Sequence, residues 1–133
     1  MIKKTLTYID FDGNTRTEDF YFNLTKAECM EMQMSTNGGL DKLLEKIIAE
    51  QDQAKIFDYM KEFVQKSYGE KSTDGKYFTK TPEALARFVS TTAYSDLFTE
   101  LATNAKAAAE FINGVIPQGY AVKDNNSAEV SNA

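Results

Sequence analysis

The sequence predicts an α+β fold that is predominantly helical, with an N-terminal β-hairpin followed by five or six helices and a disordered C-terminal tail. Three observations support this prediction. Two runs rich in β-branched and aromatic residues flank a turn at Gly13. A helix-capping pattern, Thr25 to Glu28, follows the second run almost at once. Apolar residues then recur at helical spacing through most of the remaining chain.

The hairpin is expected at about residues 3–22. Its two strands contain Thr5–Ile9 and Asp19–Phe22, whose side chains favour extended backbone. Asp12-Gly13-Asn14 lies between them and tolerates the positive φ angles of a tight turn.

The length of the turn decides how the strands pair. A three-residue loop at Gly13–Thr15 places Tyr8 opposite Phe20 and Leu6 opposite Phe22. A two-residue loop slips the pairing by one and turns the apolar faces over. We prefer the three-residue loop.

Helices are expected over about residues 25–114. The first begins with a capping box, in which the Thr25 hydroxyl accepts the Glu28 amide and the Glu28 carboxylate accepts the Thr25 amide. Leu24 and Cys29 are placed as a hydrophobic staple at this helix start.

Two further helices are expected before residue 69. Asn37-Gly38-Gly39 ends the first helix, and a second carries one apolar face at i, i+3, i+4, i+7 and i+8. That face consists of Leu40, Leu43, Leu44, Ile47 and Ile48. Asp52 caps a third helix, and Gly69 is predicted to end it in a left-handed conformation. The core stripe of the third helix is Ile56, Met60, Phe63 and Val64.

The second half of the chain continues with a polar stretch, Glu70–Lys80, that is predicted to be a loop or small hairpin with its turn at Asp74-Gly75. Thr81-Pro82-Glu83 has the pattern of a helix start, with a cap, a proline at the first position and an acid in the first turn. Leu85, Phe88 and Val89 are expected to face inward.

A break at Ser90-Thr91-Thr92 precedes a helix that carries Tyr94 to Leu101. Another helix begins near Asn104 and stops at Gly114 and Pro117. We therefore expect one globular domain at residues 1–117. Residues 118–133, rich in Asn, Ser and Ala, are expected to form a flexible polar tail.

Composition narrows the class of protein. The chain has 133 residues and a formal charge of -5, with 15 basic residues scattered among 20 acidic ones. Nucleic-acid binding is disfavoured, since phosphate contacts need clustered Lys and Arg. No apolar run reaches the roughly 18 residues of a membrane span, and the first residues lack the apolar stretch of a signal peptide. The single Cys29 forms no internal disulfide. We expect a cytoplasmic protein.

The sequence contains no histidine, so the usual general base and the commonest transition-metal ligand are both missing. We expect no enzymatic activity, no metal and no cofactor. Asp10 to Asn14 has acids at alternate positions, but its glycine falls fourth instead of sixth and Tyr21 stands where a calcium loop has Glu. Cys29 has no histidine to form its thiolate, and a buried apolar role is the preferred interpretation.

Aromatic residues on the helices are the candidates for partner binding. Phe57 and Tyr59 widen the stripe of the third helix, and Tyr94 and Phe98 recur on a later one. Such a stripe either belongs to the core or lines a groove for a partner helix. We predict that Phe57, Tyr59, Tyr94 and Phe98 form the partner-binding surface.

Several blocks of the sequence, in this order and spacing, resemble the tail assembly chaperones of siphophages that infect Gram-positive bacteria. The blocks are Thr17–Glu28, Ser35–Leu40, Lys66–Ser72 with Asp74-Gly75-Lys76, and Ala93–Phe98 with Glu100-Leu101-Ala102. The resemblance covers about residues 2–117, and no block carries catalytic chemistry.

The resemblance implies a small helical protein, made in the cytoplasm of the infected cell, that binds the phage tape measure protein and keeps it soluble. It also implies recruitment of the tail tube protein, through a longer form made by a ribosomal frameshift after Pro117, and absence from the mature virion. The alternative is a structural virion component, a small tail or head–tail connector protein, whose exposed hairpin edge would form rings by strand pairing.

Overall fold

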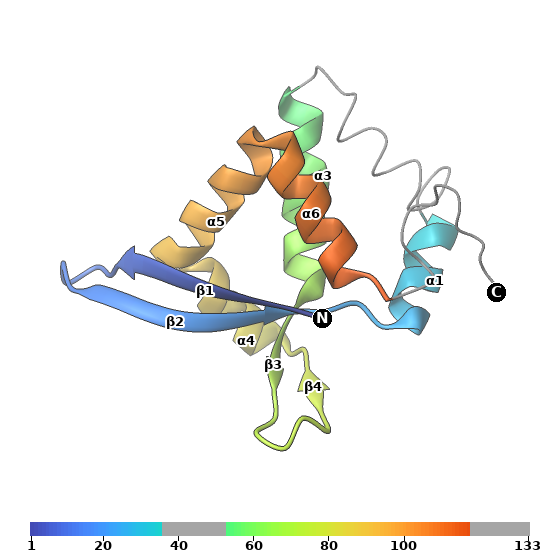
Figure 1. Cartoon of the computed structure of the whole chain (residues 1–133), viewed down its shortest axis with the longest axis horizontal. Helices are drawn as coiled ribbons and strands as arrows, with labels where there is room; N and C mark the ends of the chain where they lie inside the picture. Colours follow the sequence, from blue (N-terminus) through green and yellow to red (C-terminus); the bar gives the residue numbers. More distant parts are fainter. Residues whose placement is uncertain (36–52, 118–133) are drawn as a thin grey trace.

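The computed structural model describes residues 1–35 and 53–117. Its strands and helices follow one another in the order β1, β2, α1, α3, β3, β4, α4, α5 and α6 (Figure 1). Their bounds are β1 Ile2–Ile9, β2 Thr15–Phe22, α1 Lys26–Ser35, α3 Gln53–Ser67, β3 Tyr68–Lys71, β4 Phe78–Thr79, α4 Pro82–Val89, α5 Thr92–Thr103 and α6 Ala105–Val115. The predicted α+β class is confirmed, with an N-terminal hairpin and five helices in the described ranges.

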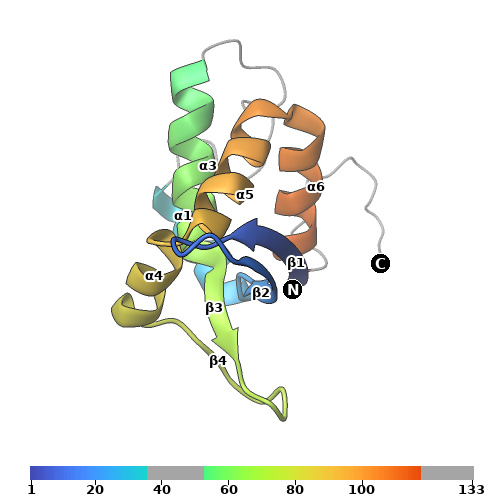
Figure 2. The ribbon, with the colours of Figure 1, turned by 90° about the vertical axis from the view of Figure 1, so that its left-hand side faces the viewer.

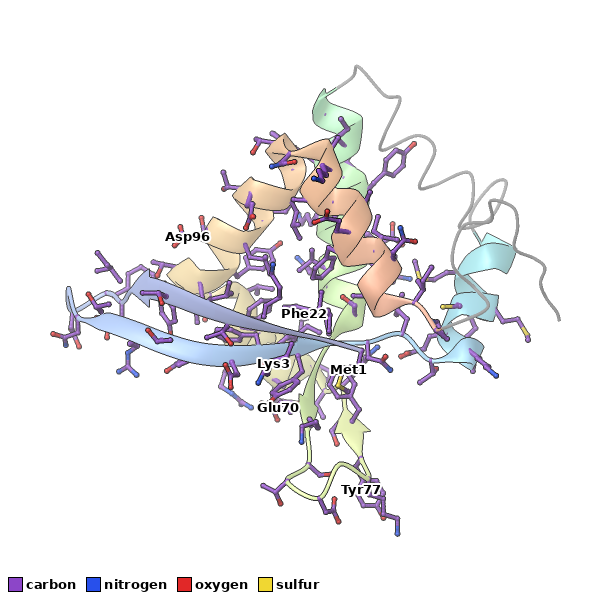
Figure 3. The ribbon with its side chains drawn as sticks, viewed as in Figure 1. Met1, Lys3, Phe22, Glu70, Tyr77 and Asp96 are labelled. Atoms are coloured by element: carbon purple, nitrogen blue, oxygen red, sulfur yellow. The ribbon has the colours of Figure 1, made fainter. Side chains whose placement is uncertain are left out.

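The sheet has four strands in the order β1-β2-β3-β4, and neighbouring strands are antiparallel. Helices α3, α5 and α6 lie next to one another on one side of it, while the β3–β4 hairpin projects away from the rest (Figure 2). Phe22 is fully buried between the sheet and these helices (Figure 3). Its ring meets those of Tyr68, Phe88 and Phe111 at 5.2 to 5.8 Å between centroids.

The predicted register of the first hairpin is wrong. Tyr8 pairs with Arg16 and Leu6 with Glu18, instead of Phe20 and Phe22. The pairing is shifted by four positions, an even number, so the predicted apolar residues still share one face of the sheet.

The reason for the different register is a five-residue turn, 10–14, that closes around Asp10. The Asp10 carboxylate accepts the backbone N–H groups of Asp12 and Asn14, both at 2.9 Å, and the Nε of Arg16 at 2.7 Å. Gly13 has φ 84°, which supplies the left-handed conformation that the turn needs.

The predicted caps at Thr25 and Thr81 are present, and the structure adds caps at Thr91 and Asn104, where the sequence predicted only a break and a helix start. In the capping box, Thr25 N–H donates to Glu28 Oε1 at 2.8 Å and Glu28 N–H donates to Thr25 Oγ1 at 3.2 Å. The hydroxyls of Thr81 and Thr91 and the side chain of Asn104 each accept a backbone N–H at the starts of α4, α5 and α6. Helix α6 ends at Val115, between the predicted stops.

Gly69 does not end α3 in a left-handed conformation, which corrects the prediction. It lies in β3, opposite Tyr21 of β2, and a Cβ on it would come within 2.5 Å of Phe78 Cε2. Glycine is favoured at this position because the Phe78 ring packs directly on the backbone and would have to move for any side chain. The predicted turn at Asp74-Gly75 is present, since Gly75 has φ 79° and connects β3 to β4.

Some predictions fall on residues that the structure does not describe. They are the end of the first helix at Asn37-Gly38-Gly39, the helix over Leu40 to Ile48, the cap at Asp52 and the tail at 118–133. Within the described ranges, no helix has the length and apolar character needed to cross a membrane.

Candidate functional site

Three of the four predicted partner-binding residues lie together. Phe57 of α3 meets Phe98 of α5 edge to face, with ring centroids 5.8 Å apart. Phe98 stacks on Tyr94, one turn earlier on α5, at 6.0 Å and 17°. We call Phe57, Tyr94 and Phe98 the aromatic ridge. Phe57 is 40% exposed, while Tyr94 and Phe98 are half-buried against the core.

The aromatic ridge is anchored to the interior. Tyr94 meets the buried Phe88 ring edge to face at 5.4 Å, and its hydroxyl accepts a hydrogen bond from Gln65 Nε2 at 3.1 Å. Phe88 in turn stacks on Tyr68 at 4.2 Å. The exposed end at Phe57 is thus connected by ring contacts to the centre of the core, which holds the ridge in a fixed position.

Tyr59 occupies a different side of α3. It is two residues from Phe57, a rotation of roughly 200° about the helix axis. Its side chain is half-buried and packs against the core. The structure therefore separates Tyr59 from the aromatic ridge.

A cavity of about 480 Å³ lies beside the aromatic ridge, between α3, the start of β3 and α4. We call it the α3–α4 pocket. Its wall is mainly apolar, and Gln65, which bonds Tyr94, is one of its lining residues. The lining residues are Glu62, Gln65, Lys66, Tyr68, Lys80, Thr81, Pro82, Ala84 and Leu85. Gln65 therefore links the pocket to Tyr94 of the ridge.

Lys80 fixes one wall of the pocket. Its Nζ donates to Glu28 Oε2 at 2.9 Å and to the carbonyl oxygens of Asn23 and Lys66, both at 2.8 Å. One ammonium group thus joins the end of β2, the start of α1 and the last turn of α3. Burial acts to raise the pKa of Glu28, but hydrogen bonds from Lys80 and Thr25 outweigh it, and the pKa lies below its ordinary value.

The other groups singled out in the sequence have structural roles. The Asp10 oxygens bond to backbone N–H groups of their own turn and to Arg16, and these hydrogen bonds lower the pKa of Asp10. Cys29 is fully buried, and desolvation raises the pKa of its thiol. Among the residues at 1–35 and 53–117, no three His, Cys, Asp or Glu side chains are grouped as metal ligands are.

Sequence reasoning missed the α3–α4 pocket. Thr81 and Pro82 were predicted only as a helix start, and Lys80 only as the end of a polar stretch. The pocket arises because α4 is set off from the end of α3 by the β3–β4 hairpin, and no local pattern encodes that separation.

Comparison with curated proteins and with solved structures gave no match. A family model described as phage tail assembly chaperone matches residues 1–132, which is almost the whole chain. The protein therefore belongs to the family of phage tail assembly chaperones.

Proposed function

We propose that the protein binds the tape measure protein of its phage, keeps it soluble and promotes assembly of the tail tube. The observation that carries this proposal is the family match over residues 1–132. The partly exposed aromatic ridge beside the mainly apolar α3–α4 pocket supports it, because a binder of this kind needs an apolar surface on a rigid scaffold.

The physical need for such a binder follows from the partner. A tape measure protein is a very long helical chain whose apolar faces aggregate before the tail tube encloses them. A chaperone must cover those faces reversibly, which favours a small interface with a few apolar anchors.

We propose that an apolar helix of the tape measure protein docks along α3. Phe57, on the aromatic ridge, and Gln65, at the α3–α4 pocket, are eight residues apart on this helix, which is roughly 12 Å along its axis and roughly 80° around it. A docked helix that runs beside α3 would place one apolar side chain on the ridge. A second, seven to nine residues further along, would enter the pocket, as in other helix-in-groove complexes.

The rest of the proposed role rests on the sequence resemblance to the chaperones of siphophages that infect Gram-positive bacteria. The phage is a siphophage of a Gram-positive host, and the protein acts in the host cytoplasm and is absent from the mature virion. A longer frameshifted form recruits the tail tube protein. Binding of this kind involves no chemical step, so the protein is not an enzyme.

Binding measured with purified tape measure segments tests both the partner and the site. The Phe57→Ser variant should raise the dissociation constant at least about tenfold, since a buried aromatic anchor contributes roughly 2 kcal/mol to the binding free energy. Phe11→Ser is the matched control, because Phe11 is 82% exposed on the hairpin turn and belongs neither to the aromatic ridge nor to the lining of the α3–α4 pocket. It should bind as the wild type does.

Two results would count against the proposal in different ways. Equal binding by wild type, Phe57→Ser and Phe11→Ser would show that the partner binds elsewhere on the protein. Lack of binding to every tape measure segment, with folded wild-type protein, would refute the proposed partner.

A further inference from the structure

Strand β1 is a long outer edge of the sheet. It pairs with β2 over eight consecutive residues, from Ile2 opposite Phe22 to Ile9 opposite Thr15, and the register stays constant throughout. The opposite edge, β4, has only two residues. Edge strands are usually protected by a bulge, a proline or a covering segment. β1 contains neither a bulge nor a proline. Helices α5 and α6 contact β1, but among the described residues α5 bonds its backbone only at Ile9.

The backbone of β1 divides into two sets of residues. Asp10 N–H donates to Asn14 carbonyl at the turn, so hydrogen-bonded pairs continue through the even-numbered residues of β1. The N–H and C=O groups of the odd-numbered residues then point away from β2. The Ile9 carbonyl confirms this direction, because it accepts the Thr92 hydroxyl of α5 at 2.6 Å.

Thr92 thus occupies one end of the edge and leaves a defined open stretch. Within the part of the chain that the structure describes, no hydrogen bond reaches the backbone groups of Lys3, Thr5 or Thr7 on this side. These three residues are evenly spaced, with Thr5 at their centre. In an antiparallel pairing centred on Thr5, Lys3 of each copy meets Thr7 of the other, which is the reciprocity that a two-fold axis requires.

We propose that β1 pairs with β1 of a second copy of this chain, antiparallel, across a two-fold axis at Thr5. Thr5 then lies opposite Thr5 of the second copy, and Lys3 lies opposite Thr7. The three pairs form about six backbone hydrogen bonds. The two four-stranded sheets become one, with the helices of both copies on the same face.

The charges of the hairpin are compatible with this pairing. Each β1 carries two lysines, Lys3 and Lys4, and neither faces a like charge across the axis. Lys4 of one copy lies opposite Leu6 of the other, in the same cross-strand row as Glu18. A second copy therefore brings a lysine towards the row that holds a carboxylate on each side of the axis, a complementarity that an arbitrary extended segment would not have.

A substitution at the axis tests the proposal. Thr5→Lys places two lysines opposite each other in the dimer, while within one copy each lies beside Asp19, to which Thr5 now donates at 2.6 Å. The matched control is Thr79→Lys on β4, which is also exposed on an edge strand and opposite an acid, Glu70.

Sedimentation of the wild type should give a mass that rises with concentration to twice 14.9 kDa. Thr5→Lys should weaken dimerisation at least about tenfold, and Thr79→Lys should leave it unchanged. A wild type that stays monomeric at all concentrations, or a dimer that Thr5→Lys does not weaken, would overturn the proposal.

Amide hydrogen exchange of the wild type makes the test independent of variants. The amides of Lys3, Thr5 and Thr7 should become protected as concentration rises, while those of Lys4, Leu6 and Tyr8 are protected throughout by β2. Exchange of Thr5 that is fast and independent of concentration would equally refute the pairing. Neither experiment uses the tape measure protein, so its outcome is separate from that of the proposed function.

Discussion

Replacing Lys80 with methionine should destabilise the fold more than its position in a polar stretch suggests. The Lys80 ammonium donates to three oxygens, which belong to Glu28, Asn23 and Lys66. Methionine keeps most of the apolar stem and removes all three donors. The variant leaves the Glu28 carboxylate without its ion pair and two carbonyl oxygens without this partner.

The magnitude follows from the exposure of the pair. A hydrogen bond to a charged group contributes about 1.5 to 3 kcal/mol when water is excluded. The Lys80 side chain is 23% exposed and that of Glu28 34%, so water replaces part of what is lost. We expect the free energy of unfolding to fall by about 2 kcal/mol, and the melting temperature by roughly 6 to 10 °C.

Urea unfolding followed by far-ultraviolet circular dichroism measures the difference directly. The control is Lys106→Met, since Lys106 is exposed on α6 and its loss should change the free energy by less than about 0.5 kcal/mol. If Lys80→Met is as stable as this control, the three hydrogen bonds do not hold β2, α1 and α3 together.

Four further outcomes are expected. The folded-state pKa of Glu28 is lowered, so its stabilisation is present above the unfolded value of about 4.5 and is lost as pH falls through the folded value. Urea unfolding at neutral and at acidic pH should therefore show that acid lowers the free energy of unfolding of the wild type more than that of the Lys80→Met variant. Gly69→Ala should cost about 1 to 2 kcal/mol in urea unfolding, because the Phe78 ring must move away. Gly114→Ala, where the new Cβ would lie 3.1 Å from Ile2 Cδ1, should be closer to neutral, since alanine favours the helix. Cys29, buried and with a raised pKa, should react with a thiol reagent only after urea is added; rapid reaction of the native protein would contradict its burial.

The parts of the fold that depend on neighbours in sequence could be predicted. The capping box at Thr25 and the Thr81-Pro82 start of α4 involve groups three residues apart, and their hydrogen bonds are present. The strand register depended instead on the Asp10 side chain, which closes a longer turn than Gly13 alone indicates.

Predictions that depended on distant packing were less complete. Gly69 after a helical stretch is typical of a C-terminal cap, but the Phe78 ring, on another strand, decides its role. The contact between Phe57 and Phe98 joins α3 to α5, and sequence could propose the residues without showing that they meet. The α3–α4 pocket and the Lys80 contacts depend on how α4 is placed relative to α3, which local patterns do not specify.

Co-expression with the tape measure protein of the same phage tests the proposed function most directly. The measurement is the fraction of tape measure protein that stays soluble and co-purifies with this chain. We predict that the wild type and Phe11→Ser keep it in solution and that Phe57→Ser does so less well. Aggregation of the tape measure protein beside abundant, folded wild-type protein would contradict the account, and recovery of the protein from purified virions would then favour a structural role.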